Sequence, residues 1–232
     1  MIKIHDRDLR GKAKTGWLDS QHTFSFGHFY DPSRMGFKSL RVINEDYIIG
    51  GAGFPTHGHE NMEIITYVIE GALEHKDSTG TGAVIRPGDI QRMSAGRGIE
   101  HSEFNHSKDQ KCHLLQIWIL PKERNIEPGY EQKTFDKAAF KNDFKLVGDR
   151  YGTDGAIKIH QDVRMLVALL DDAEEVFYDF EEGRAGFLQV ARGQITLNGE
   201  VLKQGDGAEI SDTDKISLVS QADSELILFD FG

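Results

Sequence analysis

Short apolar runs recur along the chain and are separated by glycine, Asn-Gly and Asp-Ser turns. These runs are rich in Val, Ile, Leu, Phe and Tyr, and they occupy residues 39–44, 63–71, 82–89, 113–120, 164–170, 186–193, 194–202 and 225–231. Little of the chain shows the periodicity of an amphipathic helix, whereas many short strands at regular spacing are typical of a β-barrel or sandwich. The pattern predicts an all-β protein with few helices.

The two halves of the chain carry similar patterns, which indicates a duplication. In each half a strand, a glycine turn and a second strand are followed by Gly-Asp and a further strand; the matching segments are 67–75 with 86–94, and 189–197 with 203–211. In the second copy, Asn198-Gly199 predicts a tight hairpin because these residues accept positive φ angles. This copy has no histidine in the repeat. We therefore expect two tandem β-barrels, of which only the first holds a site.

The boundary between the barrels is expected in residues 121–150. This segment contains two prolines and a dense run of charged residues and shows no strand-like alternation, so it is interpreted as a connector with a short helix. The predicted division is an N-terminal barrel that holds the site at residues 1–135 and a C-terminal barrel that lacks it at residues 136–232.

Bulk composition excludes several classes of function. The formal net charge of −11 opposes binding to a phosphate backbone, so direct nucleic-acid binding is not expected. No apolar stretch is long enough for a membrane-spanning helix, and the first residues lack the apolar core of a signal peptide. The chain has one cysteine, Cys112, and therefore no internal disulfide. A reducing, cytoplasmic location is the expectation.

Two pairs of potential metal ligands share the spacing that places residues on one face of a strand. His57 and His59 flank Gly58, and His101 and Glu103 lie two apart after a glycine-rich turn. Successive side chains on a strand point to opposite faces, so the members of each pair project together. Three imidazoles and a carboxylate facing one barrel interior would bind a divalent transition metal and leave coordination positions open.

The same residues allow other interpretations. The segment 59–63 resembles the H-E-x-x-H helix of zinc proteases, but Glu63 stands where the second histidine belongs and the following residues are strand-like. Glu63 is also a competing carboxylate ligand, because in a continuous strand it would share the face of His57 and His59. Its alternative role is a hydrogen-bond partner of a ligand. From spacing alone, the choice between Glu63 and Glu103 stays open.

At these residues the chain resembles the cupin superfamily and, within it, the pirin family. The first cupin motif, G-x5-H-x-H-x3-E, is present from Gly51 to Glu63, although its following glycine comes one residue late. The second motif survives as Gly98-x2-His101-x3-Asn105, with Gly96 in place of its proline and a longer front half. Residues 16–37 and the segments around both histidine pairs are pirin-like as well. The similarity is strongest over residues 16–120.

The resemblance implies a bicupin fold, two double-stranded β-helix barrels, with one metal site in the first barrel. The family's ligands fall on His57, His59, His101 and Glu103, and the resemblance favours Glu103 over Glu63 as the carboxylate. All four positions hold the family's residue types. The implied cofactor is one divalent transition metal ion, with iron as the first choice and nickel, cobalt, manganese, copper or zinc as alternatives.

Two functions follow from the resemblance. The first is a metal-dependent oxidoreductase of the quercetin 2,3-dioxygenase (quercetinase) type, which opens a flavonol-like ring with O₂ and releases carbon monoxide; Glu103 would be the catalytic base, and Phe54, Phe104 and Glu63 would line the substrate pocket. The second is a pirin-like coregulator, a redox-sensing regulatory protein that binds a protein partner with little or no turnover. His22, His28 and His75 are interpreted as structural or surface residues.

Overall fold

The structure consists almost entirely of antiparallel strands, with three short 3-10 helices. The computed structural model describes residues 1–232, which cluster into two compact units. We call residues 11–134 with 157–161 the N-terminal barrel, and residues 1–10, 135–156 and 162–232 the C-terminal barrel. The prediction of an all-β protein with few helices is confirmed. The division at residue 135 stays a prediction, and residues 1–10 cluster with the C-terminal barrel.

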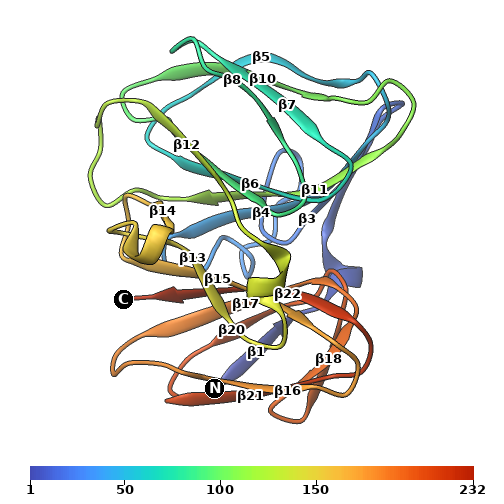
Figure 1. The fold of residues 1–232 in the computed structure, drawn as a ribbon, viewed down its shortest axis with the longest axis vertical. Helices are drawn as coiled ribbons and strands as arrows, with labels where there is room; N and C mark the ends of the chain where they lie inside the picture. Colours follow the sequence, from blue (N-terminus) through green and yellow to red (C-terminus); the bar gives the residue numbers. More distant parts are fainter. The chain divides into compact units, whose positions relative to one another are not determined.

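The N-terminal barrel is formed by two sheets that face each other across its interior (Figure 1). Its strands are β2 (Gly11–Lys14), β3 (Leu18–His22), β4 (Leu40–Ile48), β5 (Gly53–His59), β6 (Glu63–Glu70), β7 (Leu73–Asp77), β8 (Gly82–Ile85), β9 (Asp89–Ser94), β10 (Ile99–Asn105), β11 (Cys112–Ile119), β12 (Gly129–Thr134) and β14 (Ile157–Lys158). The larger sheet has the order β12-β9-β6-β11-β4-β3-β2, and the smaller one has the order β5-β10-β7-β8.

The sheets of the C-terminal barrel have a similar strand order. Its elements are β1 (Ile2–His5), η1 (Arg7–Leu9), η2 (Lys137–Phe140), β13 (Lys145–Asp149), η3 (Thr153–Gly155), β15 (Val163–Leu170), β16 (Glu175–Asp179), β17 (Ala185–Arg192), β18 (Gln194–Leu197), β19 (Glu200–Lys203), β20 (Gly207–Ile210), β21 (Lys215–Ser220) and β22 (Ser224–Phe231). From β1 to β13, the order β1-β20-β17-β22-β15-β13 matches the order from β12 to β3 in the N-terminal barrel position by position, and β16-β21-β18-β19 matches β5-β10-β7-β8. The edge strand β1 comes from the start of the chain, however, whereas β12 follows the other sheet strands of the N-terminal barrel.

The turns of the two copies match in detail. Gly71 and Gly193 have φ angles of 81° and 82°, a region that favours glycine because a Cβ would be strained there. In each Gly-Asp turn the aspartate caps the preceding backbone: Asp89 accepts from the amide of Arg86 at 2.8 Å and Asp206 from that of Lys203 at 2.7 Å. The predicted duplication is therefore visible in the structure.

The interiors of the two barrels differ in chemistry. The C-terminal barrel is filled by apolar side chains, which include Leu188, Val190, Ile195, Leu218 and Leu228, each at 0% exposure. The N-terminal barrel has smaller apolar clusters, and much of its remaining interior is polar.

The connector expected at residues 121–150 contains more structure than the sequence pattern indicated. Its short helix is present as η2. The strands β12 and β13 also lie in this segment, so the prediction that it contains no strands was wrong. β12 is an edge strand that pairs with β9, and its residues are only partly buried. Because one edge and much of both faces stay accessible, its sequence shows no apolar alternation.

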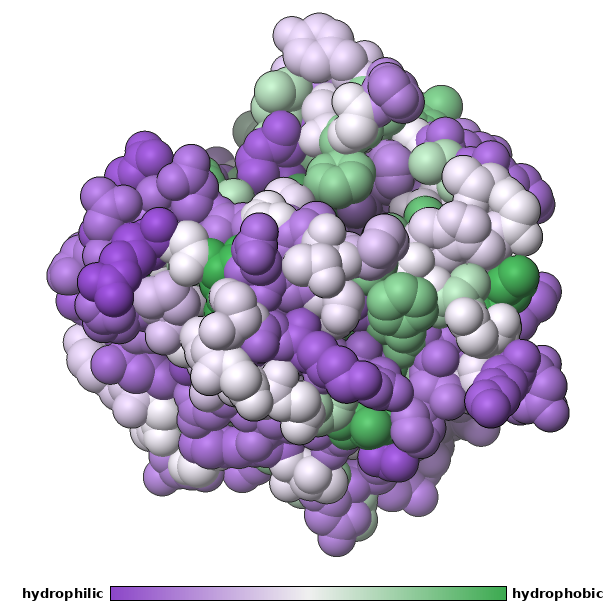
Figure 2. Space-filling view, turned by 90° about the horizontal axis from the view of Figure 1, so that it is seen from above, coloured by the Kyte–Doolittle hydropathy of each residue, from purple (hydrophilic) through white to green (hydrophobic).

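The surface is mainly polar. On the face in Figure 2 hydrophilic residues predominate, and apolar ones are dispersed among them. Large exposed apolar residues, such as Tyr30 and Tyr151, occur singly along the chain. None of the helices has the length and apolar character that crossing a membrane requires.

Candidate metal centre

Two neighbouring strands bring the three predicted histidine ligands together. In the register of β5 and β10, His57 lies opposite His101 and His59 lies opposite Ile99. A bulge between His101 and Glu103 shifts this register. The ring centroid of His101 is 4.5 Å from that of His57 and 4.9 Å from that of His59. One ring nitrogen from each of the three lies within 4.8 Å of the others, a suitable set for a metal ion.

The turn that leads into β10 depends on glycine. Gly96 has a φ angle of +49°, and a Cβ there would lie 2.1 Å from the carbonyl oxygen of Ile126. The carbonyl of Gly96 accepts a hydrogen bond from the amide of Asn61 at 2.8 Å. The substitution of glycine for the usual cupin proline therefore permits a close approach of two loops at the start of the strand that carries His101.

A count of protons shows that a cation fits this histidine set. His57 donates its Nδ1–H to the carbonyl of Pro55 at 2.8 Å, so the Nε2 of a neutral His57 carries a lone pair. At the other end of a line of rings, Asp77 accepts from His75 Nε2 at 3.0 Å, so the Nδ1 of a neutral His75 carries a lone pair as well. Between them, His101 faces His57 Nε2 at 3.1 Å and His75 Nδ1 at 3.4 Å.

A neutral His101 has one proton for these two contacts, so one pair of nitrogens is left with lone pairs opposed. A second proton on His101 is disfavoured, because burial first, and then the neighbouring His57, His59 and His75, lower its pKa to about 3. A metal ion resolves the conflict. The His57 and His101 Nε2 atoms are 3.1 Å apart, close enough for both to bind one ion at the usual metal–nitrogen distance of about 2.0–2.1 Å.

Glu103 lies beside this set rather than within its tight cluster. Its carboxylate groups with His75 and His101, and these ligand atoms lie within 4.8 Å of one another. Both oxygens accept from Gln116 Nε2, at 3.1 and 3.0 Å, and one accepts from Thr66 Oγ1 at 3.3 Å. Burial raises the pKa of Glu103, although the Gln116 hydrogen bonds oppose the shift. The structure thus brings three imidazoles together and places the carboxylate next to His101.

A cavity of about 540 Å³ opens inside the N-terminal barrel beside these residues. His57, His59, His101 and Glu103 all line it. Its apolar wall consists of Leu18, Phe26, Phe29, Phe54, Ile64 and Trp118, and its polar wall on β3, β4 and β11 consists of Ser20, His22, Asn44, Asp46 and Gln116. The volume lies within the range of small-molecule sites, which combine mostly apolar walls with a few placed polar groups.

The polar wall contains buried atoms without a hydrogen-bond partner. They include Asn44 Oδ1, Asp46 Oδ1 and Gln116 Oε1, and the indole N–H of Trp118 has no partner either. Burial raises the pKa of Asp46 to about 7, although a hydrogen bond from Ser20 acts to lower it. A buried polar group without a partner costs about 1–3 kcal/mol, so a bound molecule with matching polar atoms would gain by satisfying this wall.

The remaining pocket predictions have different outcomes. Phe54 lines the cavity, as expected. Phe104 is not among the lining residues and is 39% exposed, because it alternates with the inward-facing His101 and Glu103 on β10. His22 and His28, interpreted as structural or surface residues, do line the cavity. Neither histidine has a second potential ligand two residues away, so no signal in the sequence indicates that they line the cavity.

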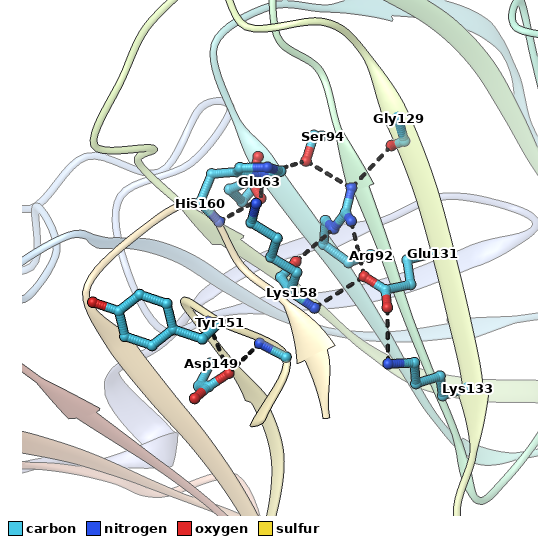
Figure 3. A network of polar contacts seen from close by, with 11 residues as sticks. Glu63, Arg92, Ser94, Gly129, Glu131, Lys133, Asp149, Tyr151, Lys158 and His160 are labelled. Atoms are coloured by element: carbon cyan, nitrogen blue, oxygen red, sulfur yellow. Dashed lines mark hydrogen bonds and ion pairs between the residues drawn. The ribbon is translucent and has the colours of Figure 1, made fainter. Parts of the chain in front are cut away.

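Glu63 is held in a separate polar network (Figure 3). The chain turns at Asn61, which has a φ of 51°, so Glu63 begins β6 instead of continuing β5. Its carboxylate accepts from both the backbone amide and Nδ1 of His160 at 3.0 Å. Ser94 joins His160 to Arg92, which also donates to Glu131 at 3.1 Å. The network anchors residues 157–161, and Glu63 is absent from the cavity wall.

Asp46 gives a testable pH dependence of stability. Its unfolded pKa is near 3.8 and its folded pKa about 7, so between these values the folded state binds more protons and stability falls as pH rises. Replacing Asp46 with asparagine removes this loss. In metal-free protein, urea unfolding should show the stability of Asp46→Asn rising relative to wild type by about 4 kcal/mol from pH 4 to 8. The exposed Asp8→Asn control should show no such trend; an equally flat difference for Asp46→Asn would contradict the prediction.

Comparison with known proteins is consistent with these features. A family model for pirin matches residues 4–119, and a model described as quercetinase C-terminal cupin domain matches residues 146–231. The Escherichia coli protein named quercetin 2,3-dioxygenase is 47% identical over 231 residues, which cover 99% of this chain and 98% of that protein. A pirin-like protein of Caulobacter vibrioides is 40% identical over 99% of both chains.

The solved structures give the same result. The bacterial pirin YhhW from Escherichia coli in complex with nickel(II) has a TM-score of 0.94 and 44% identity, and the match covers 100% of this chain and 99% of that chain. The two barrels and the histidine set of the first define a bicupin protein with a candidate metal centre. The chain belongs to the pirin family.

Proposed function

We propose that this protein is a metal-dependent dioxygenase of the quercetin 2,3-dioxygenase type, which opens a flavonol-like ring with O₂. The observation that carries the proposal is the proton count along His57, His101 and His75, which opposes two lone pairs when the three rings are neutral and so favours a bound cation. Relatives named quercetin 2,3-dioxygenase, and a relative whose structure contains nickel(II), support it.

In this proposal His57, His59 and His101 hold the ion from one side of the cavity and Glu103 supplies the carboxylate. A bound divalent metal supplies positive charge and open coordination positions for substrate oxygen. Glu103 accepts the proton of the substrate hydroxyl: it is buried, its pKa is raised, and Gln116 and Thr66 fix its position.

The cavity supports a flat, polyhydroxylated aromatic substrate. Phe26 packs edge-on against Trp118 with a centroid distance of 5.4 Å, and Trp118 packs edge-on against His59 at 5.0 Å, which gives an aromatic surface beside the histidines. Polar groups at Asn44 and Asp46, on the strand β4 that pairs with the strand of Trp118, suit ring hydroxyls or a carbonyl. We therefore place the apolar face of the rings on Trp118 and their oxygens toward β4.

The experiment compares metal-stripped protein with protein reloaded separately with Fe(II), Ni(II), Co(II) or Mn(II). Quercetin and related flavonols are supplied with and without O₂, and substrate loss, oxygen consumption and carbon monoxide are measured. We expect turnover only with a reloaded metal and only with O₂, and no turnover in His57→Ala. If wild-type protein binds one metal per chain but consumes no flavonol with any ion, the proposal fails, and a regulatory role for the metal would be favoured.

A further inference from the structure

A line of three side chains runs from β7 to the candidate metal centre. His75 and Asp77 lie two apart on β7 and so face the same side, next to Glu103 and His101 of β10 in the sheet register. Asp77 Oδ2 is 3.0 Å from His75 Nε2, and His75 Nδ1 is 3.4 Å from His101 Nδ1. Both side chains of the Asp77–His75 pair are fully buried.

The orientation of Asp77 is fixed by the turn that follows it. Its Oδ1 accepts three hydrogen bonds, from Thr79 N at 2.9 Å, Thr79 Oγ1 at 2.6 Å and Thr81 N at 3.2 Å. The other oxygen, Oδ2, is thereby left facing His75. A carboxylate is only an acceptor, so His75 must carry a proton on Nε2.

The Asp77 carboxylate determines where the protons of His75 and His101 lie. A His101 that binds a cation through Nε2 keeps its proton on Nδ1 and must donate it to an acceptor. The facing atom, His75 Nδ1, is such an acceptor when the proton of His75 is held on Nε2 by Asp77. His75 also packs against Tyr130 with a centroid distance of 4.9 Å, which limits rotation of its ring.

We infer that Asp77 and His75 are positioning residues that hold the proton of His101 on Nδ1 and so present its Nε2 lone pair to the metal. This inference rests on the metal site proposed above. It assigns to two buried residues on a third strand a role in metal affinity, although neither lines the cavity.

Asp77→Asn tests the inference because the new side chain has the same shape but opposite hydrogen bonding. The three donors on Oδ1 require the amide oxygen there, so the NH₂ group must face His75 Nε2. His75 then carries its proton on Nδ1 and donates to His101 Nδ1, which forces the His101 proton onto Nε2. We expect affinity for Ni(II), measured by calorimetry, to fall about 10–100-fold, the usual effect of disturbing a partner of a metal ligand.

His75→Asn provides the matched rescue. An asparagine places its amide oxygen near the former Nδ1 position. There it accepts the proton of His101 whether residue 77 is aspartate or asparagine. We expect His75→Asn to bind Ni(II) within a few-fold of wild type and Asp77→Asn to have no further effect in that background. In Zn(II)-loaded protein with labelled histidine, NMR should show the His101 proton on Nδ1 in wild type and in His75→Asn.

Asp149→Asn is the control for a loss of turn structure. Asp149 accepts from the amides of Tyr151, Gly152 and Thr153 in the C-terminal barrel, without a histidine partner (Figure 3). Thermal unfolding of the metal-free proteins separates a folding defect from a change in affinity. If wild type and Asp77→Asn bind Ni(II) equally, or if Asp77→Asn weakens binding as much in the His75→Asn background, the inference fails alone. If wild type binds no metal, the proposed function fails with it.

Discussion

Replacing His101 with alanine is expected to lower the affinity for a divalent metal by about a thousandfold and to abolish turnover. The loss should exceed the 10–100-fold effect of disturbing a partner of a metal ligand, because His101 is itself a member of the histidine set. Its ring lies between His57 and His75. Its removal therefore also breaks the contact that joins the Asp77–His75 pair to the histidine set. Calorimetry with Ni(II) and metal content after dialysis measure the effect.

The metal-free form of His101→Ala should remain folded. In wild type this ring is buried, and burial keeps it neutral by lowering its pKa. Its removal therefore deletes a group whose protonation at low pH would destabilise the fold, and it breaks no stabilising ion pair. His106→Ala, an exposed histidine of the same barrel, is the matched control and should leave metal binding unchanged. Wild-type affinity in His101→Ala would remove the central ligand from the proposed site.

The sequence specified the ligand strands well because period-two spacing needs only local geometry. His57 and His59 lie on β5 and His101 and Glu103 lie on β10, and each pair projects to one side as the alternation requires. Spacing did not decide between Glu63 and Glu103. The turn at Asn61, a single positive φ angle, starts a new strand and directs Glu63 to His160 instead.

The features that the sequence did not indicate depend on strand pairing. His75 and Asp77 have the same two-residue spacing as the ligand pairs, but their relation to His101 follows only from the register of β7 with β10. Likewise Ser20 and Asp46 become one polar wall because β3 pairs with β4 across that position. Register between distant strands is set by the whole barrel, so local patterns of polar residues carry little information about it.

Glu103→Gln is expected to lower kcat by about 10²–10⁴, the range attributed to a positioned general base, when the enzyme is saturated with metal. The substitution keeps the size of the side chain and removes its ability to accept a proton. The fold should tolerate it, because Gln116 Oε1 has no partner and the Gln116 amide can reverse to accept from the new amide. Three imidazoles remain to hold the ion, so metal content at saturating concentration should be retained.

The separation of kcat from metal affinity distinguishes the two roles of this carboxylate. If Glu103 acts mainly as a base, Ni(II) affinity in Glu103→Gln changes far less than kcat. If it is mainly a ligand, affinity falls strongly and added metal restores turnover. Glu63→Gln is the matched control, since Glu63 is a buried glutamate of the same barrel that contacts His160 and not the cavity. It should lower stability while the metal-saturated kcat stays near wild type, and full kcat in Glu103→Gln would exclude Glu103 as the base.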